Sequence, residues 1–210
     1  MADCEIHSRR IFIAITGASG GIYAERLINF LTPRVGRVYC CFTESGRKVV
    51  DHELKLANNP GELSLRQLAA GEVPAEWRSV IRMFRNDDLF APVASGSSAP
   101  TDMIVLPCSM GTLSRISSGA STNLIERSSD VMLKQKSRLI VCPRETPFNL
   151  IHLRNMTALA EAGAIILPLI PAFYSSHESV SDLVDFMIGR ILEMMGISHD
   201  LYQKWNSRMV

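Results

Sequence analysis

The chain has 210 residues, 47% of them hydrophobic and 20% charged, with a formal net charge of +1. This length and composition predict one globular domain over residues 1–210, and the near-zero charge does not favour nucleic-acid or membrane partners. No apolar run reaches the ~20 residues of a membrane span, which predicts a soluble protein. The five cysteines form no C-x-x-C pair, so we expect free thiols, a cytoplasmic location and no metal site.

Short apolar runs alternate with amphipathic stretches along the chain. The runs of strand length are Ile11–Ile15, Val38–Phe42, Val80–Phe84, Met103–Leu106, Leu139–Cys142 and Ala164–Leu167. The stretches of helical period are Tyr23–Leu31, Gly46–Leu56, Asn123–Gln135, Leu150–Ala162 and Ser179–Met195. This alternation predicts a three-layer α/β fold of Rossmann-like (flavodoxin-like) type, a mostly parallel sheet with helices on both faces. Because such sheets bind ligands beyond the carboxyl ends of their strands, the polar residues that follow each run are candidate site residues.

The first apolar run ends in a small-residue turn, Thr16–Gly21, that passes directly into a helical stretch. Glycines let the backbone approach a ligand and a helix N-terminus offers N–H groups to an anion, so the turn predicts a phosphate cradle. A tight strand–helix joint without a ligand is the alternative. The turn resembles the T-G-x-x-x-G-x-G opening of short-chain dehydrogenases, but Tyr23 replaces the last glycine. No tyrosine is followed by lysine four residues later, as those enzymes require, which argues against a nicotinamide nucleotide.

Residues with hydroxyl groups follow two further strands. Thr43–Gly46 follows the second run, and we expect Ser45 to cap the next helix. After the fourth run, Ser109, Gly111 and Thr112 stand where a helix N-terminus would meet a polar portion of a ligand. Flexible loops with helix caps are the alternative explanation of these segments.

Charged residues are concentrated in two later segments. Arg127, Asp130 and Lys134 share one face of the predicted helix Asn123–Gln135, which is a ligand-facing or simply a solvated face. Arg144 and Glu145 lie between two prolines directly after a strand, so both are held rigidly at its carboxyl end. Arginine suits a phosphate and glutamate suits proton transfer, which favours a functional role for this pair.

Four segments, taken in order, resemble the flavin prenyltransferase family (UbiX, formerly described as 3-polyprenyl-4-hydroxybenzoate carboxy-lyase). These segments are TGASGGIY, ASGSSAPTDMIVLPCSMGTLSRISSGASTNLIERSSDVMLK, CPRETPFNLIHLRNM and GAIILPLIPAFY, and the resemblance runs from Ile11 to about Trp205. It implies a metal-independent transferase that joins the dimethylallyl group of dimethylallyl phosphate to N5 and C6 of reduced FMN. The product, prenylated FMN, would serve a UbiD-type decarboxylase in ubiquinone or aromatic-acid metabolism.

The resemblance also implies roles for individual residues. Those implied to bind FMN are Gly17, Ala18, Ser19, Thr43, Ser109, Met110, Gly111, Thr112 and Arg144. Those implied to bind dimethylallyl phosphate are Lys134, Arg144, Glu145, Tyr174, Arg190 and Trp205. The implied catalytic residues are Ser19, Glu53, Lys134 and Glu145. In our hypothesis Glu145 gives a proton to the departing phosphate and Glu53 helps to remove the ring proton.

The resemblance further implies a homo-oligomer, with the dodecamer of the family as the expected form and active sites where subunits meet. Residues 1–10 are expected to be a flexible N-terminus, and residues 196–210 a tail that reaches the active site or a neighbouring subunit. Homologous cysteine decarboxylases are a weaker match, because their P-x-M-N motif is missing here. An FMN-binding decarboxylase, or a non-catalytic flavin-carrying accessory subunit of a decarboxylase, is the alternative function.

Overall fold

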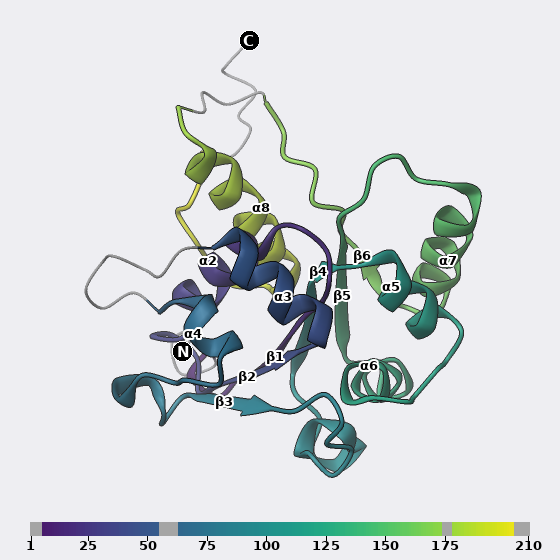
Figure 1. Ribbon diagram of the computed structural model, residues 1–210, viewed down its shortest axis with the longest axis horizontal. Helices are drawn as coiled ribbons and strands as arrows, with labels where there is room; N and C mark the ends of the chain where they lie inside the picture. The colour runs from purple at the N-terminus through teal and green to yellow at the C-terminus, as the bar shows by residue number, and fades with distance from the viewer. Residues whose placement is uncertain (1–5, 55–62, 174–177, 204–210) are drawn as a thin grey trace.

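The computed structural model describes residues 6–54, 63–173 and 178–203. In this part of the chain six parallel strands form one sheet in the order β3-β2-β1-β4-β5-β6 (Figure 1). The strands are β1 (Arg10–Ile15), β2 (Arg37–Phe42), β3 (Ile81–Phe84), β4 (Asp102–Cys108), β5 (Arg138–Pro143) and β6 (Ile165–Ile166). This order is that of the Rossmann fold, in which the winding direction reverses between β1 and β4. The predicted Rossmann-like parallel α/β fold is confirmed.

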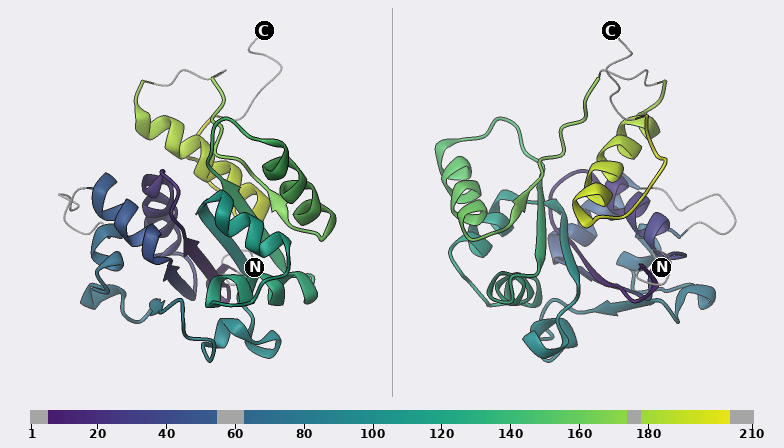
Figure 2. Two further views of the ribbon diagram at one scale, coloured as in Figure 1. Left: turned by 45° about the vertical axis from the view of Figure 1, so that its right-hand side comes forward. Right: turned by 180° about the vertical axis from the view of Figure 1, so that it is seen from behind.

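Helices cover both faces of this sheet (Figures 1 and 2). One face carries α2 (Gly21–Leu31), α3 (Glu44–Glu53), the short α4 (Leu65–Ala69) and α8 (Val180–Met195). The other carries α5 (Met110–Ser117), α6 (Leu124–Lys134) and α7 (Leu150–Glu161). Single 3₁₀ turns lie at η1 (Ala75–Trp77), η2 (Pro92–Ala94) and η3 (Gly96–Ser98). No helix in the described ranges is long and apolar enough to span a membrane.

The alternation of side chains along β1 explains the two layers of helices. Ile11, Ile13 and Ile15 belong to the hydrophobic core shared with α2, α4 and α8. Phe12 and Ala14 belong to the core shared with α5, α6 and α7. Successive strand residues point to opposite faces, so a strand that is apolar at every position must be buried on both sides. The central strand β1 is therefore enclosed on both faces, and a ligand can reach it only at its ends.

The N-terminal segment was expected to be flexible over residues 1–10, of which 1–5 lie outside the described residues. Arg10 is the first residue of β1. Arg9 Nη1 donates a hydrogen bond to the carbonyl of Met195 at 2.6 Å. These two arginines are therefore held against the fold and do not belong to a free terminus.

The C-terminal segment lies against α8 as far as it is described. The rings of His199 and Tyr202 pack over Gly189, where an added Cβ would lie 2.4 Å from the Tyr202 ring. Only glycine at this position lets the two rings lie so close to the helix. Trp205 is among the undescribed residues 204–210, so the reach of the tail stays a prediction.

Candidate functional site

The carboxyl ends of β1 and β4 flank the point where the winding of the sheet reverses, which is where sheets of this type bind ligands. Thr16, only 1% exposed, connects these two ends. Its Oγ1 donates to the carbonyl of Pro107 at 2.8 Å and accepts from the backbone N–H of Ser109, also at 2.8 Å. One buried hydroxyl group therefore fixes the turn after β1 relative to the start of α5.

The glycine turn enters α2 through Gly20, whose φ of 113° is a conformation that other residues rarely adopt. The backbone N–H groups of Gly20 and Gly21 donate to Oε2 of Glu53, at 2.9 and 3.1 Å. For these two N–H groups the predicted availability to an anionic ligand is wrong, because a carboxylate of the same chain accepts from both. The positive end of the α2 dipole favours a negative charge at this place.

Glu53 joins the turn to the segment after β5. Arg144 Nε donates to the carbonyl of Ser19 at 3.2 Å, and the Ser19 hydroxyl bonds to the Glu53 carboxylate. Partial burial raises the pKa of Glu53, but the hydrogen bonds from Ser19 and the two glycine N–H groups, with the charge of Arg144, outweigh it and leave the pKa below its usual value. At neutral pH Glu53 is therefore ionised and can accept a proton.

The end of β2 lies beside the same turn. A Cβ on Gly17 would lie 2.4 Å from Ser45 Oγ, so only glycine permits this approach to the first turn of α3. Thr43 is the N-cap of α3: its Oγ1 accepts from the N–H of Gly46 at 2.9 Å and lies 3.1 Å from Ser45 Oγ. The prediction that Ser45 caps this helix is wrong, because the helix begins two residues earlier than expected.

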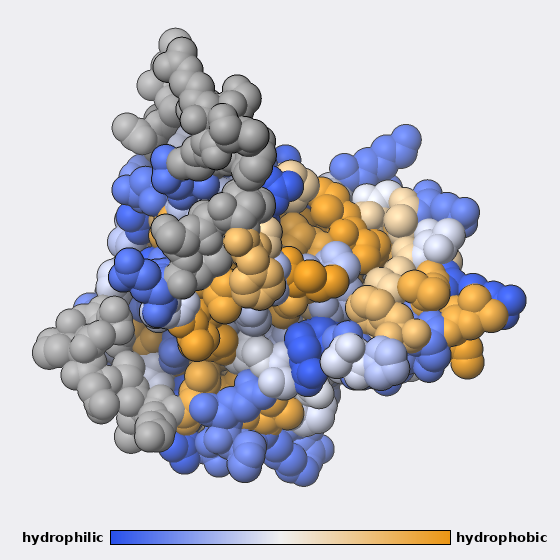
Figure 3. Space-filling view, turned by 90° about the horizontal axis from the view of Figure 1, so that it is seen from above, coloured by the Kyte–Doolittle hydropathy of each residue, from blue (hydrophilic) through white to orange (hydrophobic). Residues whose placement is uncertain are grey.

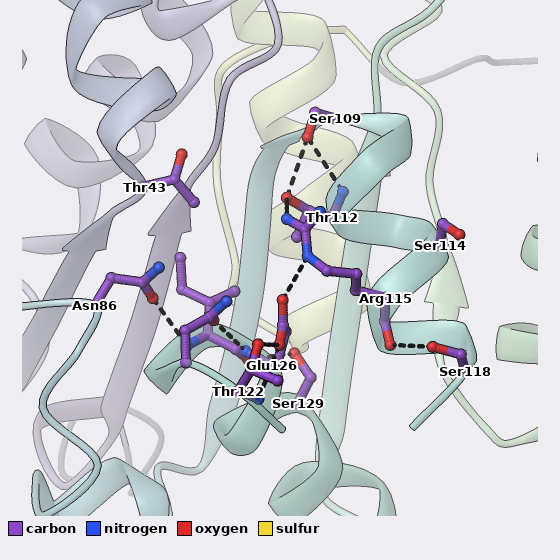
Figure 4. A network of polar contacts seen from close by, with 12 residues as sticks. Thr43, Asn86, Ser109, Thr112, Ser114, Arg115, Ser118, Thr122, Glu126 and Ser129 are labelled. Carbon is purple, nitrogen blue, oxygen red and sulfur yellow. Dashed lines mark hydrogen bonds and ion pairs between the residues drawn. The ribbon is translucent and has the colours of Figure 1, made fainter. Parts of the chain in front are cut away.

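A second pair of hydroxyl groups lies at the start of α5. Ser109 is the N-cap, its Oγ accepting from the N–H of Thr112 at 3.3 Å, and the two hydroxyl oxygens are 3.1 Å apart. Thr112 Oγ1 also accepts from Arg115 Nη2 at 3.4 Å. Arg115 Nε in turn donates to Glu126 Oε1 at 2.5 Å. Figure 4 shows these contacts running from Ser109 to Glu126 in α6.

Arg144 and Glu145 follow β5 and have different partners. The backbone N–H of Arg144 donates to the carbonyl of Cys108 at 3.2 Å, which ties this segment to the end of β4. The exposed Glu145 accepts from the backbone N–H of Thr146 at 3.0 Å. The side chain of Arg144 instead contacts the glycine turn. The two neighbouring charged side chains, both between Pro143 and Pro147, therefore point in different directions.

Two basic residues that were predicted to bind the substrate, Lys134 and Arg190, lie on α6 and α8, outside the glycine turn and the start of α5. Lys134, the exposed last residue of α6, precedes the amino end of β5, whose six residues separate it from the carboxyl edge by roughly 20 Å. Arg190 forms an ion pair with Glu193 and lines a cavity of about 350 Å³ between α8 and β6. Tyr174, like Trp205, lies outside the described residues. Predicted residues at the carboxyl edge are Gly17, Ala18, Ser19, Thr43, Glu53, Ser109, Met110, Gly111, Thr112, Arg144 and Glu145.

Comparison with known proteins gives this arrangement its family. The model of the Flavoprotein family matches residues 2–192. A Halalkalibacterium halodurans protein named "Flavin prenyltransferase UbiX" is 43% identical over 194 residues, which are 92% of this chain and 91% of that protein. The chain belongs to the flavin prenyltransferase family. The predicted family is confirmed, and with it the assignment to the transferases.

Two solved structures of UbiX and UbiX-like proteins agree with this family assignment. AnUbiX (PadA1), in complex with FMN and dimethylallyl pyrophosphate, has a TM-score of 0.83 and 34% identity, covering 95% of this chain and 98% of that one. A dodecameric FMN-dependent UbiX-like decarboxylase from Escherichia coli O157:H7 has a TM-score of 0.81 and 32% identity, covering 94% and 100%.

The sequence predictions missed three residues at the carboxyl edge of this flavin prenyltransferase. Thr16 lies within the glycine turn, and its position directly after a buried strand was a signal that its hydroxyl needs a partner. Arg115 and Glu126 are eleven residues apart on different helices, and no periodicity of either helix predicts that they meet. Among the described residues, no group of three or more His, Cys, Asp or Glu side chains could hold a metal ion.

Proposed function

We propose that this chain transfers a dimethylallyl group from its phosphate ester to N5 and C6 of reduced FMN, and so makes the prenylated FMN cofactor of a UbiD-type decarboxylase. The observation that carries the proposal is the meeting of Ser19, Glu53 and Arg144 at the glycine turn, in a chain 43% identical to a flavin prenyltransferase. AnUbiX was solved with dimethylallyl pyrophosphate, so both the mono- and the diphosphate are candidate donors.

The residues at the carboxyl edge fit FMN in chemistry. Gly17 lets Ser45 Oγ approach the glycine turn, and the hydroxyls of Ser45 and Thr43 beside that turn suit the flavin phosphate. The Ser109–Thr112 hydroxyls suit polar atoms of the flavin ring. When bound, reduced FMN supplies the two nucleophilic ring atoms that accept the dimethylallyl group.

Three charged side chains act on the departing phosphate and on the proton of the flavin ring. The C–O bond of the donor breaks as negative charge collects on the phosphate, and Arg144 is placed to stabilise that charge. Glu145, exposed beside Arg144, gives a proton to the departing phosphate. Glu53, whose lowered pKa leaves it ionised at neutral pH, accepts the ring proton. An ionised carboxylate can take up a proton, which supports this role for Glu53.

We propose that the enzyme works as a homo-oligomer, a dodecamer like the Escherichia coli relative. Lys134 lies roughly 20 Å from the carboxyl edge of its own chain, which supports its delivery by a neighbouring copy. Leu150, Ile151 and Leu153 of α7 are 59%, 65% and 47% exposed, as an interface would require. Figure 3 shows hydrophobic surface on the side where α7 lies in Figure 1.

The setting of the reaction is part of the same proposal. A product that is itself a cofactor must pass to a second enzyme, and ubiquinone or aromatic-acid metabolism is the pathway class we propose. Cys40, Cys41, Cys108 and Cys142 are free and buried, as suits a reducing cytoplasm.

The test is incubation of the protein with dimethylallyl phosphate or diphosphate and reduced FMN, followed by mass spectrometry of the flavin and an assay of released phosphate. We expect a flavin heavier by one dimethylallyl group and one phosphate or diphosphate released for each flavin changed. An accessory subunit would bind FMN and leave the donor intact. That outcome would contradict the transferase proposal.

A further inference from the structure

We propose that Arg115 and Glu126 are positioning residues that fix the Ser109–Thr112 hydroxyl pair for the flavin. The inference rests on the proposed function, because it takes the start of α5 as part of the flavin site. It adds to that function a pair of charged residues that lie behind the binding hydroxyls and set their orientation.

Glu126 is the anchor of this arrangement. Its side chain is 1% exposed, yet the carboxylate is fully engaged: Oε1 accepts from Arg115 Nε at 2.5 Å, and Oε2 accepts from the N–H and the hydroxyl of Thr122 at 3.0 and 2.6 Å. Burial raises the pKa of Glu126, but the hydrogen bonds from Thr122, Arg115 and Asn123 leave it below its usual value. A buried, ionised carboxylate thus joins α5, α6 and the loop between them.

Arg115 links Glu126 to the Ser109–Thr112 hydroxyl pair. The guanidinium group is planar, so fixing Nε on Glu126 also fixes the direction of Nη2, which donates to Thr112 Oγ1 at 3.4 Å. About half of the Arg115 side chain is exposed, and a side chain of this length would otherwise sample many rotamers. The buried carboxylate therefore holds an otherwise mobile donor against the first turn of α5, as Figure 4 shows.

The polarity of these contacts sets what the hydroxyl pair offers to a ligand. Arginine can only donate, so Thr112 Oγ1 must accept from Arg115. Ser109 Oγ already accepts from the N–H of Thr112. The contact between the two hydroxyls uses one of their two protons, and the other remains for a ligand acceptor. Arg115 thereby orients the pair as a hydrogen-bond donor toward the flavin.

Two variants of the full-length protein test this proposal. Arg115→Lys keeps the charge that Glu126 needs but loses the fork, because one ammonium group cannot reproduce both fixed contacts of the guanidinium. Arg115→Met/Glu126→Met removes both charges and leaves neither unpaired in the interior. In both we expect FMN to bind about 3- to 10-fold more weakly, the loss of roughly one hydrogen bond, with a changed visible absorption spectrum of bound flavin.

Arg66→Lys is the matched control, because Arg66 Nε makes the same type of contact, 2.6 Å to Asp51, between α3 and α4. We expect this control to keep wild-type FMN affinity and spectrum. Wild-type affinity and spectrum in folded Arg115→Lys would overturn the positioning role, even if its melting temperature fell. If the double variant does not fold, Arg115→Lys alone decides. Failure of the wild-type protein to bind FMN would instead contradict the proposed function.

Discussion

Polar side chains lie at both the amino edge and the carboxyl edge of the sheet, but they have different roles at the two edges. At the amino edge, Asp102 is 1% exposed and its carboxylate is paired with Arg138 and Arg9 and accepts from Thr101. All of these partners belong to the fold. At the carboxyl edge, the Ser109–Thr112 pair retains a hydroxyl proton for a ligand. The comparison teaches that charged side chains whose partners all lie within the chain stabilise the fold. Polar side chains that keep an unused hydrogen-bonding group can instead bind a ligand.

The largest effect is expected at the carboxyl edge, from Glu145→Gln. The amide keeps the volume of the side chain but has no carboxylic proton to give to the leaving phosphate. We expect the single-turnover rate at saturating donor to fall about 10²- to 10⁴-fold with FMN still bound. Glu161→Gln, at the exposed end of α7, is the control. A Glu145 variant as fast as the wild type would refute the catalytic role and weaken the contrast between the edges.

At the amino edge we expect the reverse pattern from Asp102→Asn. The change leaves Arg138 and Arg9 without their buried carboxylate, which should lower the free energy of unfolding by about 3 kcal/mol. Urea unfolding measures this loss, and FMN affinity of the folded variant should not change. Asp87→Asn breaks the exposed pair with Arg85 and should leave stability unaltered. A weaker flavin complex in Asp102→Asn would mean that the two edges are coupled.

Thr43 sharpens the comparison, because we assign it both a role in stabilising the fold and a role in binding the flavin. As the N-cap of α3 it should contribute about 1 kcal/mol, and Thr43→Ala should lose that amount in urea unfolding. Because we also assign its hydroxyl to the flavin site, the same variant should bind FMN more weakly. Thr43→Ser keeps the hydroxyl and serves as the control. Loss of stability with unchanged FMN affinity would leave Thr43 a helix cap only.

The smallest effect concerns pH and Glu53. Its pKa in the folded protein lies below the usual 4.5, so the ionised form favours folding. This contribution is complete above pH 4.5 and is lost as pH falls through the lower folded-state value. Stability of Glu53→Gln should therefore depend less on pH in this acidic range than that of the wild type, as urea unfolding across pH can measure. Parallel pH curves for both proteins would contradict the lowered pKa.

The strands and long helices were predictable because their apolar patterns are local. The contacts within the candidate site were harder to predict, because they join residues far apart in the sequence. Asn123 and Glu126 have capping-box spacing, and Asn123 does cap α6, but the Glu126 carboxylate turns to Thr122 and Arg115 instead of completing the box. The contact of Glu53 with Gly20 spans 33 residues and depends on how α3 crosses the glycine turn. Such pairings follow from tertiary packing, which no local pattern contains.

Cys108, the last residue of β4, directly precedes Ser109, which we assign to the flavin site. Burial raises the pKa of its thiol to about 12, although the N–H of Leu113 and the charge of Arg115 act against the rise. At pH 7 on the order of one molecule in 10⁵ carries the reactive thiolate. Allylic phosphates are alkylating agents, and a thiolate beside one would compete with the flavin for the allyl group. The fold thus keeps the Cys108 thiol unreactive and protects it from alkylation by the donor that we propose the enzyme binds.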